Sequence, residues 1–177
     1  MRHGHESEGC AENGKVRHGH ERRGRAEVLR HGDKRQWKGT GSMNIIRLTG
    51  GMGNQMFQYA LYLKLCSLGR EVKFDDISEY DRPGVRPIML WAFGIDYPRA
   101  SKDEINQITD GFLKFSHRVR RKLFGRRSKE YYEGSCNFDE QVLLQEPAYL
   151  TGYFQSEKYF KDIGEQVREA FTFSGKI

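Results

Sequence analysis

Residues 43–76 have the sequence MNIIRLTGGMGNQMFQYALYLKLCSLGREVKFDD, and this stretch decides the expected fold class. It opens with a short β-type run over residues 44–49, followed by a glycine-rich turn over residues 50–55. Residues 56–68 are apolar almost all round, which predicts a buried helix that the next glycine ends. Residues 72–74 predict a second strand. The order strand, helix, strand predicts a right-handed β-α-β unit, so we expect an α/β fold with a parallel sheet.

Further elements are expected downstream of this unit. Ser101 and Glu104 have the spacing of a capping box, which predicts the start of a short helix. Residues 149–154 predict another strand, and Ser156 is expected to cap a last helix. The buried stripe of that last helix would consist of Phe160, Ile163, Val167 and Phe171.

The segment 111–129 is strongly basic and contains no acidic residue. Its apolar side chains would share one face of a helix and are Phe112, Phe115, Val119 and Leu123. This pattern leaves three interpretations open: a solvated face, a surface for anionic lipid, or a surface for nucleic acid. Nucleic acid is not the expected partner, because no platform of aromatic side chains for base stacking is evident.

Residues 1–42 differ from residues 43–177 in amino-acid composition. They contain ten Lys and Arg, six Asp and Glu, eight Gly and five of the six His, but no Phe, Tyr or Ile. Such a segment buries too little apolar area to offset its ordering entropy, so we expect a disordered basic extension. Its His-Gly-His pairs are weak metal candidates without residues to orient them, and the physiological start is either Met1 or Met43.

Composition excludes several classes of protein. The 177 residues include 30 Lys and Arg against 24 Asp and Glu, and the net charge of +6 permits anionic partners. Cys10, Cys66 and Cys136 are too few and too far apart for a disulfide framework or a zinc site. No apolar run has the roughly 20 residues of a membrane span, and the polar N-terminus is not a secretory signal. These features predict a cytoplasmic protein, with peripheral membrane contact as an option.

The glycine-rich turn is the first candidate site. It lies after a strand and before a helix, where backbone N–H groups favour anions and glycines let a ligand approach closely. It matches neither G-x-G-x-x-G nor the lysine-bearing P-loop. Ordinary strand-to-helix geometry is about as good an interpretation, although the amides of Asn54 and Gln55 suit sugar hydroxyls.

A second candidate is the acidic cluster that follows the second strand. Its members are Asp75, Asp76, Glu79 and Asp81. A carboxylate at this place could act as a general base on an alcohol. Solvated loop acids are the commoner case, so both interpretations stay open.

Two blocks of sequence resemble a known family. Residues 50–60, GGMGNQMFQYA, resemble the opening motif of the α-1,2-fucosyltransferases, glycosyltransferase family 11. In that family the motif also follows a short apolar strand, usually with leucine where Met52 stands. Residues 152–160, GYFQSEKYF, look like a second family block, in the family's order. The resemblance covers residues 43–177 and excludes residues 1–42.

The resemblance implies transfer of L-fucose from GDP-fucose to a hydroxyl of a glycan, often the 2-hydroxyl of galactose. The reaction inverts the anomeric centre and needs no obligatory metal or cofactor other than this donor substrate. The implied fold is GT-B, with two Rossmann-like domains around a cleft, of which residues 43–177 would be the N-terminal one. The substrate-binding residues would be Gly51, Met52, Gly53, Asn54 and Gln55.

One family block has no counterpart in this chain. The family stabilises the leaving diphosphate with an arginine in a His-x-Arg-Arg-x-Asp block. Residues 117–121, HRVRR, have one residue too many between the histidine and the arginine pair. We therefore expect about the first half of an enzyme, inactive alone and with unassigned catalytic residues. The alternatives are a non-catalytic glycan- or nucleotide-binding module and a basic nucleic-acid-binding protein.

Overall fold

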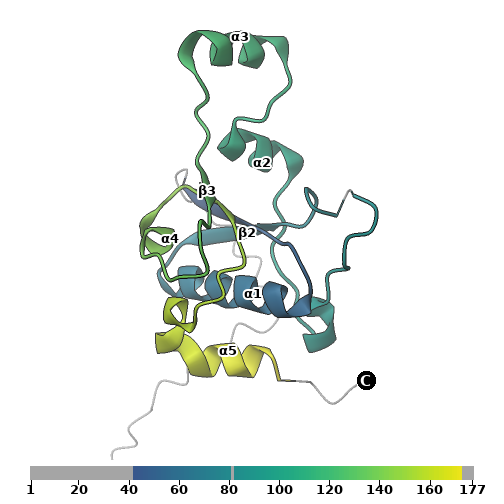
Figure 1. The fold of residues 1–177 in the computed structure, drawn as a ribbon, viewed down its shortest axis with the longest axis vertical. Helices are drawn as coiled ribbons and strands as arrows, with labels where there is room; N and C mark the ends of the chain where they lie inside the picture. The colour runs from purple at the N-terminus through teal and green to yellow at the C-terminus, as the bar shows by residue number, and fades with distance from the viewer. Residues whose placement is uncertain (1–41, 81, 173–177) are drawn as a thin grey trace, which may run out of the picture. The chain divides into compact units, whose positions relative to one another are not determined.

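A four-stranded parallel sheet organises the computed structural model, which describes residues 42–80 and 82–172 (Figure 1). The strand order is β2-β1-β4-β3, and each neighbouring pair is parallel. The strands are β1 (Met43–Arg47), β2 (Glu71–Asp75), β3 (Glu130–Tyr132) and β4 (Tyr149–Thr151). The expected α/β class and parallel sheet are confirmed.

The first strand, helix and strand form the expected β-α-β unit. Strands β1 and β2 pair in register from Met43 opposite Glu71 to Arg47 opposite Asp75. The connecting helix α1 spans Met52–Ser67. It begins at Met52 rather than at residue 56, so the prediction of a turn over all of residues 50–55 is wrong. The turn is confined to the residues before Met52, and the other glycine-rich residues form the first helical turn.

The end of α1 follows the sequence prediction. Gly69 has a φ of +80°, which a residue without a Cβ adopts at little cost. Its N–H donates to Cys66 O (2.9 Å), and the N–H of Arg70 donates to Leu65 O (3.2 Å). This pair of hydrogen bonds is a Schellman motif, so glycine ends the helix as expected.

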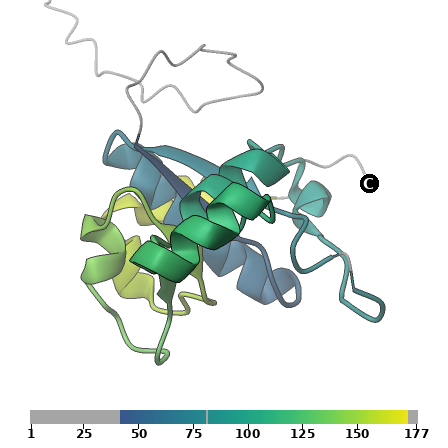
Figure 2. The same cartoon turned by 90° about the horizontal axis from the view of Figure 1, so that it is seen from above.

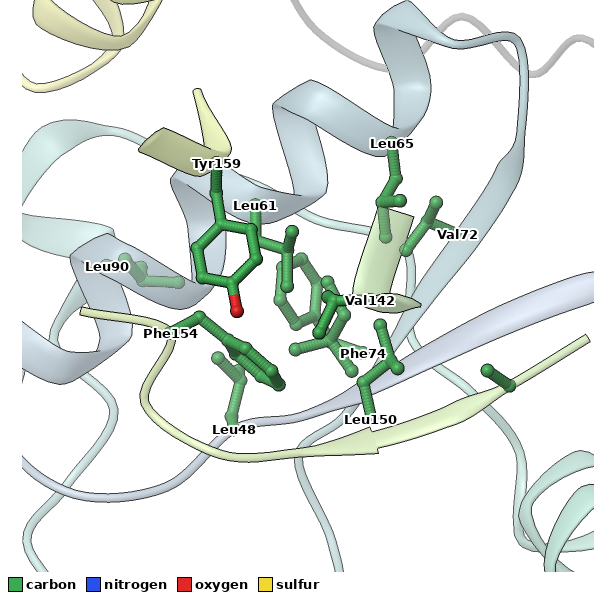
Figure 3. Packing of buried hydrophobic residues seen from close by; sticks show 12 residues of the cluster. Leu48, Leu61, Leu65, Val72, Phe74, Leu90, Val142, Leu150, Phe154 and Tyr159 are labelled. Carbon is green, nitrogen blue, oxygen red and sulfur yellow. The ribbon is translucent and has the colours of Figure 1, made fainter. Parts of the chain in front are cut away.

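Helices cover the sheet on both faces. Ile46 belongs to the larger core cluster. Other members of this cluster, among them Leu61 of α1, Phe74 and Leu150, are labelled in Figure 3. Ile45, the neighbour of Ile46, belongs to a second cluster. Adjacent strand residues point to opposite faces, so the second cluster lies on the other side of the sheet. That side is covered by α2 (Lys102–Thr109).

The remaining helices of the described residues are short. They are η1 (Leu90–Phe93), α3 (Phe115–Phe124), α4 (Gln141–Leu144), η2 (Glu157–Tyr159), η3 (Lys161–Ile163) and α5 (Gly164–Ala170). Helix α2 begins with the expected capping box: Glu104 N–H donates to Ser101 Oγ (3.2 Å), and Ser101 N–H donates to Glu104 Oε2 (2.8 Å). Strand β3 and helix α4 were not anticipated.

The C-terminal prediction is wrong in its boundaries. Strand β4 ends at Thr151, and Ser156 precedes a 3-10 turn without capping it by its side chain. The buried Tyr159 ring anchors this segment, and its hydroxyl accepts a hydrogen bond from Asp139 N–H (3.0 Å). Phe160 has a φ of −138°, which is incompatible with a continuous helix. The α-helix therefore starts only at Gly164.

Two other expectations fall wholly or mostly outside the described residues. Of the expected extension 1–42 the structure describes only Ser42, and Asp81 of the acidic cluster is also outside the described residues. All described residues belong to one of the two units into which the chain divides, His31–Ile177. No helix in this described part has the length and apolarity to cross a membrane.

Candidate functional site

The candidate site lies at the edge of the sheet where the strands end. All four strands are parallel, so their carboxyl ends meet at one edge, the position at which open α/β sheets bind ligands. The glycine-rich segment follows β1 there, and the GYFQ segment (residues 152–155) follows β4. Strands β1 and β4 are hydrogen-bonded neighbours. The fold thus brings the two motif blocks together.

The first turn of α1, at this edge of the sheet, has backbone N–H groups without partners in the helix. The first helical hydrogen bond runs from Gln55 N–H to Gly51 O (3.1 Å). The N–H groups of Met52, Gly53 and Asn54 precede it and have no carbonyl partner inside the helix. Gly51 is the N-cap residue, and the first turn contains no acidic side chain. This helix end therefore carries uncompensated positive partial charge.

An arginine lies against the same turn. A Cβ on Gly51 would stand 2.9 Å from Arg86 Nη1, so the guanidinium lies directly against the backbone of this glycine. Arg86 forms no ion pair with any described residue. The helix terminus and this free cation together suit an anion such as a phosphate group. No sequence motif marks Arg86, because it lies in a loop more than thirty residues after the glycines.

Asn54 connects the two motif blocks. Its Oδ1 accepts a hydrogen bond from Gln155 Nε2 (2.8 Å), across 101 positions of the chain. Its Nδ2 has no hydrogen-bond partner among the described residues, although a Cβ on Gly50 would come within 2.3 Å of it. Asn54 is the third residue of α1 and does not cap it. The amide oxygen of Asn54 therefore binds Gln155, and its NH2 group remains available to a ligand.

Gln55 has a different environment from the one expected. Its side chain is completely buried. Its Nε2 donates to Gly50 O (3.0 Å) and Pro87 O (3.1 Å), and its Oε1 accepts from Met89 N–H (2.8 Å). Both ends of the amide are engaged, so Gln55 positions the loop that carries Arg86 instead of presenting its amide at the surface.

Gln58, one turn further along α1, has a similar role. It is also completely buried. Its Oε1 accepts from Thr49 N–H (3.2 Å), and its Nε2 donates to Gly152 O (2.8 Å). Gln58 thereby links the residue segments that follow β1 and β4. Two glutamines three residues apart on the buried side of α1 are the sequence signal for this arrangement.

Glu133 shapes the turn after β4. Its carboxylate accepts hydrogen bonds from Tyr153 N–H (2.7 Å) and Phe154 N–H (3.0 Å). Phe154 has a φ of +52°, an uncommon conformation for a bulky residue that these bonds help to hold. Gly152 is required beneath the carboxylate, because a Cβ there would stand 2.5 Å from Glu133 Cβ. Glu133 therefore positions the GYFQ segment.

The acids after β2 are already engaged in the folded chain. Asp75 is completely buried, and its Oδ2 accepts from Tyr149 OH (2.6 Å) and Ser78 OH (2.5 Å). Burial opposes the charge of Asp75, but the hydroxyl and backbone donors outweigh it and keep its pKa below the ordinary value. Burial and the neighbouring carboxylate raise the pKa of Tyr149. Asp75 is therefore a structural carboxylate.

The other two described acids of this cluster form ion pairs. Asp76 Oδ2 lies 3.1 Å from Arg99 Nε, and Glu79 pairs with Arg47. Asp81 is outside the described residues. No group of acidic, histidine or cysteine side chains within the described part of the chain could hold a metal ion.

Two buried polar atoms near the same edge lack partners. They are Arg47 Nε and Thr151 Oγ1, which make no hydrogen bond with the described residues. Arg47 ends β1 and Thr151 ends β4, and the register of these neighbouring strands places them side by side. Unsatisfied buried groups of this kind commonly mark a place for water or a ligand.

No family model, no curated protein and no solved structure matches this chain. The function is therefore inferred from the motifs and from the geometry of the carboxyl edge. Of the five residues expected to bind substrate, Gly51, Met52, Gly53 and Asn54 lie at the surface of this edge. Gln55 lies beneath them.

Proposed function

We propose that residues 43–177 form the N-terminal, Rossmann-like domain of a GT-B fucosyltransferase related to glycosyltransferase family 11. The reaction is transfer of L-fucose from GDP-fucose to a hydroxyl of a galactose-containing glycan, with inversion. One observation carries the proposal. The hydrogen bond between Asn54 and Gln155 joins the two blocks that resemble the family, at the edge where parallel sheets bind ligands.

The chemistry of the site fits a sugar nucleotide and a glycan. The start of α1 and the guanidinium of Arg86 offer positive charge to a diphosphate. The free side of the Asn54 amide offers a hydrogen-bond donor to a sugar hydroxyl. Gly53 presents backbone with open space above it, because a Cβ there would meet no atom within 4 Å. These groups bind and orient a substrate.

Residues outside this set would be needed for the transfer itself. Displacement of GDP requires stabilisation of charge on the leaving diphosphate, which the family assigns to its His-x-Arg-Arg-x-Asp block. The chain contains no such block, so its role in the reaction is binding and positioning. By itself the chain should bind substrate without turning it over.

Ligand-observed NMR on the full chain tests the proposal. Saturation transfer should reach GDP-fucose or methyl β-galactoside, and it should be much weaker for methyl β-glucoside and for UDP-glucose. Methyl β-glucoside differs from methyl β-galactoside only in the configuration at C4. UDP-glucose has the same diphosphate charge as GDP-fucose but a different base and sugar. Equal transfer to all four, or transfer to none, would remove the fucosyltransferase assignment. Tighter binding of RNA than of either sugar ligand would favour the nucleic-acid alternative.

A further inference from the structure

Helix α3 is oriented with its apolar stripe away from the protein. Phe115, Val119 and Leu123 follow one another at four-residue spacing and so share one face. Amphipathic surface helices ordinarily turn such a face toward the core. Here no residue of α3 is buried, and the helix lies beyond α2 (Figure 1). In the view from above, α3 lies nearest the viewer (Figure 2).

The opposite face of α3 is bound to the protein by arginines. Arg120 and Arg121 both pair with Asp110, the largely buried residue at the end of α2. Arg121 Nη1 also donates to the carbonyl oxygens of Asp110 (2.7 Å) and Phe112 (2.8 Å). These contacts determine which side of the helix faces inward. The outward orientation of the apolar stripe is therefore built into the folded chain.

The outward surface combines large apolar side chains with free cations. In the stripe, the exposed fractions are 81% for Phe115, 38% for Val119 and 69% for Leu123, and Leu113 (85%) and Phe124 (70%) are exposed at the two ends of the helix. Several cations of the segment form no ion pair with any described residue, namely Lys114, Arg118, Lys122, Arg127 and Lys129. Exposed apolar patches of this kind mark interaction surfaces.

We propose that this surface, Leu113–Phe124, docks the protein on an anionic lipid bilayer. Apolar side chains would enter the boundary between headgroups and acyl chains, while Arg118 and Lys122 remain at the level of the anionic headgroups. A bound nucleic acid would contact the cations but would leave the apolar stripe exposed to water. A protein partner would have to desolvate the free cations, which is costly without matching acids. A bilayer contacts the apolar side chains and the cations at the same time.

Vesicle co-sedimentation of the full chain tests this docking. The chain should bind vesicles of phosphatidylcholine with phosphatidylglycerol at low salt. It should bind vesicles of phosphatidylcholine alone far more weakly and should be released from anionic vesicles as salt rises, because charges are screened over about 10 Å at 0.1 M. The double variant Phe115→Gln/Leu123→Gln should bind roughly tenfold more weakly or worse, since two large side chains no longer enter the bilayer.

Matched variants separate α3 from other causes of binding. Arg118→Gln/Lys122→Gln should weaken binding at low salt and reduce its salt dependence. Leu144→Gln removes an exposed leucine of α4 and should bind like the unmodified chain. The basic residues 1–42 are the same in every variant, so their contribution cancels. Circular dichroism should show unchanged folding, because the substituted stripe is outside the core.

Several results would overturn the proposal. One is equal binding by the unmodified chain and by Phe115→Gln/Leu123→Gln. Another is no vesicle binding, or equal binding to neutral and anionic vesicles. Self-association that this double variant abolishes, without vesicle binding, would assign the surface to a second copy of the chain. RNA binding that is tighter than vesicle binding and insensitive to the double variant would assign it to nucleic acid.

Discussion

The Asn54 side chain accepts a hydrogen bond from Gln155 Nε2 at 2.8 Å, which ties the first turn of α1 to the segment that follows β4. The two residues belong to the two blocks that resemble the fucosyltransferase family. Asn54 is also past the N-cap position, which Gly51 occupies. Its side chain is thus placed by a neighbouring motif and not by the need to cap a helix.

The first prediction concerns the stability of Asn54 variants. Asn54→Ser and Asn54→Ala should lower the free energy of unfolding by no more than about 0.5–1.5 kcal/mol, the usual value of one hydrogen bond. The two should be alike, because neither removes a cap. Thermal melts of both variants measure this. A marked loss in Asn54→Ala together with an unchanged Asn54→Ser would show that Asn54 is a cap after all.

Substitution of Gly53 by alanine should raise the stability of the chain and lower its affinity for a ligand. Gly53→Ala places a methyl group in open space on α1 and should stabilise the chain by up to about 1 kcal/mol. The same methyl group would obstruct close approach of a ligand to the helix start, so affinity should fall. Urea unfolding and a ligand titration on the same variant measure the two effects. Higher stability with unchanged affinity would place the ligand elsewhere.

Gly152 provides the contrasting substitution. Gly152→Ala drives a Cβ to within 2.5 Å of Glu133 Cβ and 2.7 Å of its Oε2. Displacement of the carboxylate should release the backbone of Tyr153 and Phe154 and lower stability by about 1–3 kcal/mol. Chemical denaturation of Gly53→Ala and Gly152→Ala side by side should therefore give shifts of opposite sign. Shifts of the same sign would contradict the packing described at one of these glycines.

Loss of the Gln55 amide should unfold the loop that carries Arg86. Gln55→Leu keeps most of the buried volume but leaves Gly50 O, Pro87 O and Met89 N–H without their partner. An unsatisfied buried backbone group costs about 1–3 kcal/mol, so a loss in this range or above is expected from urea unfolding. Gln141→Leu, on the exposed surface of α4, is the control and should change stability little. Equal effects of the two substitutions would refute the role given to Gln55.

The Asp75 carboxylate should make folding sensitive to acid. Its pKa is lower in the folded chain than in the unfolded chain, so its contribution is present at neutral pH. That contribution is lost as the pH falls below about 4, through the ordinary and then the folded pKa of an aspartate. Asp75→Asn should be less stable than the unmodified chain at pH 7, and the difference should shrink in acid. Urea unfolding at several pH values, with Glu140→Gln as control, checks this; a constant difference would count against it.

Local patterns predicted the first part of the fold well. The strand candidates, the apolar helix and the glycine that ends it depend on neighbours in sequence, and the structure has them. The start of α1 was misplaced, because a glycine run resembles a turn while the buried contacts of Gln55 favour helix. The last helix was misplaced because the distant contact between Tyr159 and Asp139 holds the chain in a 3-10 turn.

Contacts between distant segments also explain what was missed at the site. A helix over about residues 112–124 was recognisable from its pattern, but α3 begins only at Phe115, so Phe112 lies outside it. The orientation of α3 depends on the pairing of Arg120 and Arg121 with Asp110. The approach of Arg86 to Gly51 likewise follows from the anchoring of its loop by Gln55. Periodicity and motif spacing carry no information about such pairings.

The most direct test of the central claim is titration of the full chain and of Asn54→Ser with GDP-fucose and with methyl β-galactoside. Asn106→Ser, the same change on α2, is the matched control. We predict that the unmodified chain and Asn106→Ser bind at least one of the two ligands with the same affinity. Asn54→Ser should bind that ligand about tenfold more weakly, which corresponds to the loss of one good hydrogen bond, and should lose no more stability than the hydrogen bond to Gln155 contributes. Equal affinity of all three proteins, or binding of neither ligand by the unmodified chain, would contradict a substrate site at Asn54.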